Sequence, residues 1–380
     1  MINNHSRQNL KQKYFRFRNR LKYFQLKSLK RKEIGDKYTN NLLLNEYKLN
    51  NDLKNKIKLF WKKFGFEVDT RWQQAYISVN GIEDHRYIPE DIFYVFIEPN
   101  LNRKDLYHAY VDKNNYDRLF TGFKTPKTIL RNIDGKYYDG NYERITLANI
   151  NDFLKKHSGE YIIKPSIDSS GAKNVMKLQC DSQKLFIDGK CATVESVEKI
   201  ICRDFLVQEF LEQHSLLKSI YPHSLNTFRV VTLRMGDEIH ALQSIVKFGD
   251  SGNFVDYTVD RGGIHCGLNN NGMLNKFAVD KYFKKYYKHP YTGVSFENIQ
   301  IPQFSSVLDF VKNLHRYLLY FDMVSWDIAI DKNGEPVLIE LNLINQGISF
   351  LQVHHGPIFG DFTEKMIGNV QHITRFFTGN

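Results

Sequence analysis

The chain has 380 residues, of which 42% are hydrophobic and 25% charged, and its formal net charge is +11. This composition excludes a disordered or fibrous chain, and no apolar run approaches the roughly 20 residues that a membrane-spanning helix needs. The four cysteines, Cys180, Cys191, Cys202 and Cys266, contain no CxxC pair, so neither a disulfide framework nor a zinc site follows and a cytoplasmic location is expected.

The excess positive charge lies in the first 65 residues, which carry +14, while the remaining chain carries −3. Tyr14, Phe17, Leu21 and Phe24 follow helical spacing among basic residues, and a second helix is expected over 51–64. The basic N-terminus has no apolar core and is therefore not a secretory signal. Basic helices with aromatic residues suit an anionic membrane surface, which residues 1–32 would contact at the inner face of the membrane, or an acidic partner. The alternative is a helix whose aromatic stripe packs on the same protein, and nucleic acid is the least favoured partner.

From about residue 85, short strands and helices alternate. We expect strands at Asp91–Glu98, Tyr161–Lys164 and Phe205–Phe210, and helices at Asp112–Phe120, Ser196–Arg203 and Val307–Tyr320. Hairpins are expected over 185–194, over 227–248, and around a turn at 331–336. The pattern predicts an α+β fold built from antiparallel hairpins.

The last hairpin carries a candidate metal site. Asn333-Gly334 is a strong signal for a two-residue type I′ turn, and such a turn places Asp327 directly opposite Glu340, with Asn342 on the same face. Because two like charges facing each other are destabilising, these three oxygen ligands suggest a hard cation such as Mg²⁺. The alternative is an exposed hairpin whose charges face solvent, but the flanking strands are apolar.

A second candidate site follows the strand that ends at Lys164-Pro165. The loop after it contains Ser166, Ser169, Ser170 and Gly171, and it offers a cation with hydroxyl and backbone donors that suit a polyphosphate. It lacks the GxxxxGK[ST] pattern of a Walker loop. Taken alone, this segment is more typical of an ordinary turn.

Further polar positions lie on the strands that come next. Gln208-Glu209-Phe210-Leu211 ends a strand, and a polar break at 212–214 follows it. Arg229 and Lys247 lie on later strands, where a charge that points inward must find an anion. For either side chain taken singly, a position that faces solvent is favoured.

In this order, the segments resemble the ATP-grasp superfamily. The features are Asp112-Lys113 opening a helix, a loop at Pro126, Lys164-Pro165, the run 208–211, Asn226-Thr-Phe-Arg229, Gly262-Gly263, Asp327 and Glu340-Leu-Asn342. The NTFR box, the GG pair and the WDIAI…IELN ending are most similar to the sugar-transfer-associated branch, found with polysaccharide biosynthesis. The resemblance covers residues 85–380 and implies two ATP-grasp subdomains, 85–204 with a phosphate-covering flap and 205–380 with the metal-binding hairpin, behind a basic, mainly helical segment 1–84.

The resemblance also implies roles for individual residues. Lys113 and Lys164 would contact the phosphates of ATP, and Ser166, Ser169, Ser170 and Gly171 would form the flap. Gln208, Glu209, Phe210 and Leu211 would meet the adenine, and His214 or Glu212 would lie near the ribose, where the sequence departs from the more familiar pattern. Asp327, Glu340 and Asn342 would hold Mg²⁺. Arg229 and Lys247 would steady the transferring phosphate, with Asp256 a weaker candidate.

The implied reaction joins a carboxylate to an amine through an acyl phosphate, with ATP and Mg²⁺ and without a side-chain nucleophile. By analogy the substrates are a sugar carboxylate, such as a uronic acid of a capsule polysaccharide, and a small amine, such as an amino acid, an amino alcohol or its phosphate. Three alternatives stay open: an ATP-grasp kinase, a peptide-forming amino acid ligase, and a non-catalytic nucleotide-binding adaptor of a glycosyltransferase.

Overall fold

The computed structural model describes residues 21, 24–167, 173–181, 184–252 and 262–368. They group into two compact units. One unit comprises the described parts of Met1–Arg103, Val279–Lys285 and Ile344–Asn380, and the other comprises those of Lys104–Ala278 and Tyr286–Leu343. The units divide the chain differently from the predicted segments 1–84, 85–204 and 205–380, because the last described residues group with the N-terminal helices.

The first unit is mainly helical. A helix over 24–40 comes first, and further helices follow in chain order. These are α2 (Leu43–Glu46), α3 (Asn51–Lys63), α4 (Arg71–Asn80), α5 (Glu90–Ile92), the π-helical turn η1 (Phe93–Ile97), α6 (Glu98–Leu101), α13 (Ile348–His355), the 3-10 turn η5 (Gly360–Phe362) and α14 (Thr363–Gly368). The prediction of a helix over 51–64 is confirmed by α3. Among the residues that the structure describes, no helix is long and apolar enough to cross a bilayer.

The predicted strand Asp91–Glu98 is wrong, because this run is helical, from α5 through η1 into α6. Ile92, Phe93, Tyr94 and Phe96 point in different directions around the helix and all are buried, so apolar side chains cover most of its circumference. A helix without a polar face lacks the 3.6-residue periodicity that identifies a helix in sequence, and it is then indistinguishable from a buried strand.

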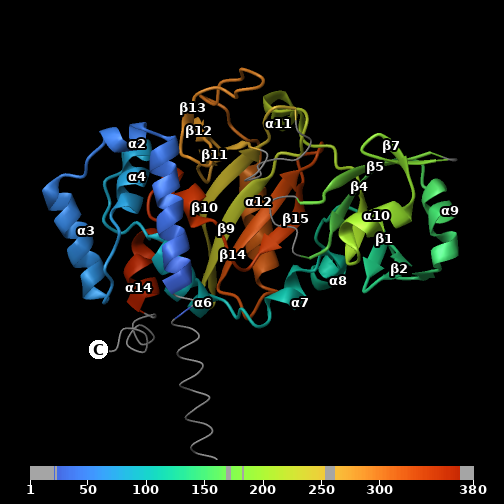
Figure 1. Ribbon diagram of the computed structural model, residues 1–380, viewed down its shortest axis with the longest axis horizontal. Helices are drawn as coiled ribbons and strands as arrows, with labels where there is room; N and C mark the ends of the chain where they lie inside the picture. The colour runs from blue at the N-terminus through green and yellow to red at the C-terminus, as the bar shows by residue number, and fades with distance from the viewer. Residues whose placement is uncertain (1–20, 22–23, 168–172, 182–183, 253–261, 369–380) are drawn as a thin grey trace, which may run out of the picture. The chain divides into compact units, whose positions relative to one another are not determined.

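The second unit contains two antiparallel sheets with helices between and around their strands (Figure 1). The eight-stranded sheet has the strand order β3-β2-β1-β8-β4-β5-β6-β7. Its strands are β1 (Thr128–Ile133), β2 (Lys136–Asp139), β3 (Arg144–Ile145), β4 (Gly159–Pro165), β5 (Met176–Cys180), β6 (Leu185–Ile187), β7 (Lys190–Ala192) and β8 (Phe205–Glu209). The helices are α7 (Tyr107–Val111), the 3-10 turns η2 (Lys113–Asn115) and η3 (Leu147–Asn149), α8 (Tyr116–Leu119), α9 (Ile150–Lys155) and α10 (Val194–Ile201).

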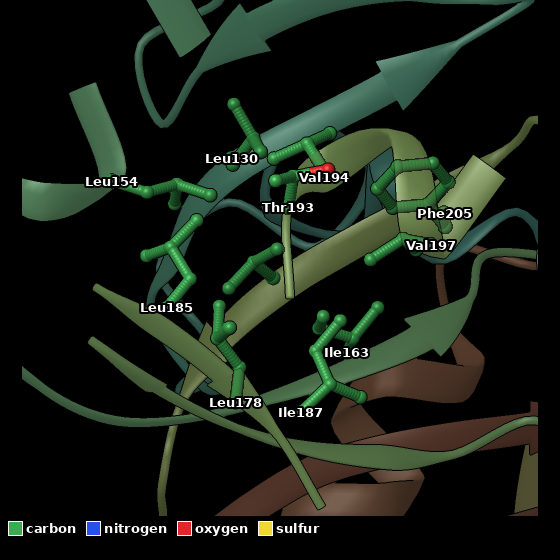
Figure 2. Close-up of a pocket in the computed structure, with 11 residues that line it drawn as sticks. Leu130, Leu154, Ile163, Leu178, Leu185, Ile187, Thr193, Val194, Val197 and Phe205 are labelled. Atoms are coloured by element: carbon green, nitrogen blue, oxygen red, sulfur yellow. The ribbon is translucent and has the colours of Figure 1, made fainter. Parts of the chain in front are cut away.

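An apolar pocket lies in the core of this sheet, where side chains of α9 and α10 meet the strands (Figure 2). Leu154 of α9, Val197 of α10 and Val207 of β8 line it. Only Thr193 contributes a polar side chain. A lining of this kind has no groups for the phosphates or ribose of a nucleotide, so the pocket belongs to the packing of the core.

The seven-stranded sheet has the order β13-β12-β11-β10-β9-β14-β15. Its strands are β9 (Phe228–Met235), β10 (Glu238–Phe248), β11 (Ile264–Leu268), β12 (Leu274–Val279), β13 (Lys285–Tyr286), β14 (Met323–Ile330) and β15 (Pro336–Asn342), and its helices are α11 (Ser215–Ile220) and α12 (Phe304–His315). Helix α12 contacts β9, β10, β14 and β15, and Val307 and Val311 share its core with Trp326. Side chains alternate along β14, so Asp327 lies on the other face of the sheet from Trp326.

The predicted hairpins are confirmed. Strands β6 and β7 pair around the turn at 188–189, and β9 and β10 pair from Met235 and Glu238 outward. Strands β14 and β15 pair across the turn at 331–335. These elements establish the antiparallel α+β fold that the sequence predicts.

Candidate functional site

The pairing of Asp327 with Glu340 is confirmed, but the turn that produces it differs from the prediction. Gly334 has a left-handed φ of +86° and donates its N–H to Asp331 O, so a type I turn with a left-handed glycine closes the hairpin. The ladder then places Ile328 opposite Leu338, and a bulge shifts the register before Asp327 meets Glu340. The observed turn has one residue more than the predicted turn, and the bulge adds one residue to the opposite strand. The two differences cancel, so Asp327 still pairs with Glu340.

Asp327 is buried and surrounded by cations. Arg229 binds it in a bidentate manner, with Nε 3.0 Å from Oδ1 and Nη2 2.8 Å from Oδ2. Lys247 Nζ lies 3.2 Å from Oδ2, and the Asn342 amide donates to the same oxygen at 3.4 Å. Burial would raise the pKa of Asp327, but Arg229 and Lys247 outweigh it and hold that pKa well below its usual range.

Glu340 has its own cation. Lys113, buried on η2, donates from Nζ to Glu340 Oε1 at 2.8 Å. The backbone N–H of Lys113 donates to Ser166 O at 2.9 Å, which joins η2 to the end of β4. The repulsion between the two facing carboxylates is therefore compensated within the chain by Arg229, Lys247 and Lys113.

Lys164 is buried beside Lys113, and no hydrogen-bond acceptor for its Nζ occurs among the described residues. Burial and the charge of Lys113 lower the pKa of Lys164 to about 7, and Glu340 offsets this only in part. The neighbouring Ser166 hydroxyl is also buried, and it has no hydrogen-bond partner in the described part of the chain. An ammonium and a hydroxyl left in this state fit an anion with several oxygens.

The strand expected to meet adenine is β8. Gln208 is buried, and its amide donates to Pro126 O and Thr128 Oγ1, both at 3.1 Å. Glu209 is exposed, with its side chain 3.4 Å from Lys127. Phe210 is 44% exposed, and Lys177 Nζ lies 5.6 Å from the centre of its ring. Leu211 lies beyond the end of β8, which ends at Glu209.

The residues expected near the ribose have other contacts in this structure. His214 caps α11, where its Nδ1 accepts from Leu216 N–H at 3.2 Å. Glu212 pairs with Lys332 at 2.9 Å. Ser169, Ser170 and Gly171 of the expected flap lie outside the described residues, and so does Asp256.

One face of the seven-stranded sheet collects the charged residues of the site. Residues directly opposite in an antiparallel ladder share a face, as Glu340, Asp327 and Arg229 do across β15, β14 and β9. Lys247, two residues beyond Ile245, which pairs with Arg229, continues this face onto β10. Figure 1 shows the three strands β9, β14 and β15 side by side.

Two residues that the sequence analysis did not assign adjoin this face. His265 on β11 is buried and lies opposite Lys247, a pairing that only the strand register reveals. Tyr116 on α8 accepts a hydrogen bond from Leu341 N–H at 3.3 Å. Burial and the charge of Glu340 raise the pKa of Tyr116 well above its usual value, so its hydroxyl stays neutral.

The donor set fits Mg²⁺. Asp327, Glu340 and Asn342 supply two carboxylates and an amide oxygen from adjacent strands, and hard cations prefer such oxygens together with phosphates. The described residues contain no group of three or more His, Cys, Asp or Glu side chains that alone holds a metal. Two protein carboxylates completed by a nucleotide are the usual arrangement for Mg²⁺.

The chain belongs to the sugar-transfer-associated ATP-grasp family, whose family model matches residues 95–365. This match includes Lys113, Lys164, Arg229 and the β14–β15 hairpin. The search of curated proteins gave no match.

Similar solved structures are ligases by their descriptions, and one of them, PsnB, is described as an ATP-grasp ligase. They include an L-amino acid ligase from Bacillus licheniformis (13% identity, TM-score 0.37, 68% of this chain and 47% of that chain). Others are the VanG D-Ala:D-Ser ligase from Enterococcus faecalis (14%, 0.40, 70% and 61%) and PsnB in complex with its minimal precursor, Mg and ADP (12%, 0.39, 71% and 62%). The match thus spans about half to two thirds of each of these chains.

Proposed function

We propose that the protein is an ATP-dependent ligase that joins a sugar carboxylate to a small amine. The observation that carries this proposal is the cluster of Lys113, Lys164, Arg229 and Lys247 around two facing carboxylates. The family membership supports the use of ATP, and the association of the family with sugar transfer supports a uronic acid of a capsule or other surface polysaccharide as the acid. The amine would be an amino acid, an amino alcohol or its phosphate.

The proposed reaction has two steps. A carboxylate oxygen of the acid attacks the γ-phosphorus, ADP leaves, and an acyl phosphate forms. The amine nitrogen then attacks the carbonyl carbon, phosphate leaves, and the nitrogen loses its proton. Negative charge develops on phosphoryl and carbonyl oxygens in both steps, and cations that are already in place stabilise it.

Within this scheme each side chain has a distinct task. Lys113 and Lys164 bind the phosphates from the side of the eight-stranded sheet, and Arg229 and Lys247 hold the transferring phosphoryl group from the other sheet. Asp327, Glu340 and Asn342 would hold Mg²⁺, which supplies charge neutralisation of the phosphate oxygens when bound. Three of the four contacts to Asp327 fall on Oδ2, which has two lone pairs, so Lys247 would exchange Oδ2 for phosphate when ATP binds.

The test is product formation with Mg-ATP and pairs of uronic acids and amines. We expect phosphate release that requires both the acid and the amine, together with an amide product in mass spectra. Glu340→Gln, which keeps the shape of the side chain, should lower kcat by at least about a hundredfold.

Other outcomes would favour the alternatives. A stable phosphorylated product indicates a kinase, and turnover with two amino acids but no sugar acid indicates a peptide-forming ligase. Nucleotide binding without turnover on any pair, unchanged in Glu340→Gln, indicates the adaptor of a glycosyltransferase and contradicts the metal assignment.

We further propose that the protein works in the cytoplasm, at the inner face of the membrane, where residues 1–32 contact anionic lipid. The charge of +14 in the first 65 residues supports this, since the remaining chain is close to neutral. In this position the ligase would meet a glycosyltransferase partner and its lipid-linked product.

A further inference from the structure

Helix α3 (Asn51–Lys63) carries a basic outward face. Its 13 residues include five lysines, and Asp52 is its only acid. All five lysines, at positions 54, 56, 58, 62 and 63, are exposed. A helix of this length extends about 20 Å, so the positive charge is dense along it.

The inward face of α3 fixes this orientation. Ile57, Phe60 and Trp61 are buried, and the Asn50 side chain caps the helix by accepting Leu53 N–H at 2.7 Å. The lysines therefore point outward because the core holds the opposite side of the helix. A partner that binds them does not need to order this segment first.

Most of this charge is uncompensated within the described part of the chain. Lys63 pairs with Glu364 of α14 at 2.9 Å. Lys54, Lys56, Lys58 and Lys62 form no ion pair with any described residue. Four neighbouring cations without acidic partners repel one another, and an anionic surface relieves that repulsion.

An exposed leucine lies among the lysines. Leu59 is 68% exposed, and on a helical projection it lies on the outward face between Lys62 and Lys63. The helix that precedes α2 shows the same combination, because Leu29 is 60% exposed next to basic residues. Aliphatic side chains within a basic face are typical of helices that lie in the boundary layer of a bilayer.

We propose that the outward face of α3 is a docking surface for a bilayer rich in anionic lipid. The alternative of nucleic acid fits less well, because the face has no arginine and no exposed aromatic ring, and Leu59 gives no stacking surface for a base. This inference extends the proposed membrane contact from the N-terminal arm to a folded helix, and its test does not depend on the ligase reaction.

The experiment is co-sedimentation of the full chain with vesicles of phosphatidylcholine that contain 30% phosphatidylglycerol. The variant changes Lys54, Lys56, Lys58 and Lys62 together to glutamine. Each lysine near an anionic surface contributes about fivefold to binding, so the loss of two such contacts lowers the partition coefficient about 25-fold, and we expect at least this fall. Leu59→Ser should lower it about tenfold with the charge unchanged.

The control variant changes Lys136, Lys184, Lys190 and Lys199 to glutamine. These lysines are also exposed but lie in and around the eight-stranded sheet, so the net charge changes equally while α3 is intact. We expect at most a twofold effect. Equal binding by the α3 variant and the wild type, or an equal loss in the control, would overturn the proposal. Tighter binding to duplex DNA than to the vesicles, lost in the α3 variant, would replace the membrane with nucleic acid.

Discussion

At the level of residues, the buried charge of Lys164 lowers the stability of the fold. Its folded pKa of about 7 lies below the ordinary lysine value, so between pH 7 and 10 the unfolded chain binds the proton more tightly and stability rises with pH. Lys164→Met removes a buried ammonium, and we expect it to raise the free energy of unfolding at pH 7 by about 1 kcal/mol or more without nucleotide. Urea denaturation at pH 7 and pH 9 measures both effects.

The same substitution should weaken ATP binding by at least tenfold, because the phosphate loses a buried cation. Lys190→Met, on exposed β7, serves as the control and should change neither quantity. If Lys164→Met left ATP affinity intact, the assignment of Lys164 to the phosphates would fail.

Asp327 has the opposite dependence on pH. Because Arg229 and Lys247 lower its folded pKa, the stability it contributes is fully present above about pH 4 and is lost as the pH falls toward that lowered pKa. Asp327→Asn leaves both cations uncompensated and should cost about 3 kcal/mol at pH 7. In thermal unfolding at pH values from 7 to 3, the difference in Tm between the variant and the wild type should become smaller as the pH falls. If the difference in Tm were the same at every pH, the ion pairs of Asp327 would not be the cause of the lost stability.

At the level of elements, substitutions in the turn of the β14–β15 hairpin can distinguish the observed type I turn from the predicted type I′ turn. Only Gly334 has a left-handed φ here, whereas a type I′ turn requires one at Asn333 as well. Gly334→Ala should therefore cost about 1 kcal/mol, and Asn333→Ala should have less than half that effect. If both substitutions lowered the free energy of unfolding by a similar amount in denaturation experiments, the type I′ turn would be supported instead.

The apolar pocket behind the eight-stranded sheet offers a second test at this scale. Val197→Ile adds one methylene to its lining and should raise the free energy of unfolding by about 0.5 kcal/mol without changing ATP binding. Val175→Ile, at a partly exposed position outside the pocket, is the control. A lower stability for Val197→Ile would show that the pocket has no room for the added group.

The sequence predicted the elements whose signals are local. Hairpins with turn residues and helices with a polar face, such as α3, were found, because side-chain period and turn chemistry are written within a few residues. Asp91–Glu98 was missed because burial on all sides removes the period. The opposition of Asp327 and Glu340 was predicted from a different turn and holds because of the bulge. The place of His265 opposite Lys247 depends on register between strands, which a single sequence does not encode locally.

At the level of the whole molecule, ATP should bind as the magnesium complex and stabilise the fold. At a hundred times its dissociation constant, Mg-ATP should add about 2.7 kcal/mol to the free energy of unfolding, visible as a higher Tm. Removal of Mg²⁺ with EDTA should reduce this gain, and in Glu340→Gln the gain should be nearly independent of Mg²⁺. A gain that is the same with and without Mg²⁺ in the wild type would exclude metal binding by this hairpin.

The bulge in β15 also determines where the β14–β15 hairpin tolerates inserted or deleted residues. It lies between the turn and the carboxylates, so it sets the alignment of Asp327 with Glu340 independently of what happens beyond Ile330 and Pro336. Insertions at Asn333 should therefore be tolerated with activity retained, whereas deletion of Leu341, beyond the bulge, should move Asn342 to the other face of the sheet. The turn is thus a suitable position for a fluorescent label or an affinity tag.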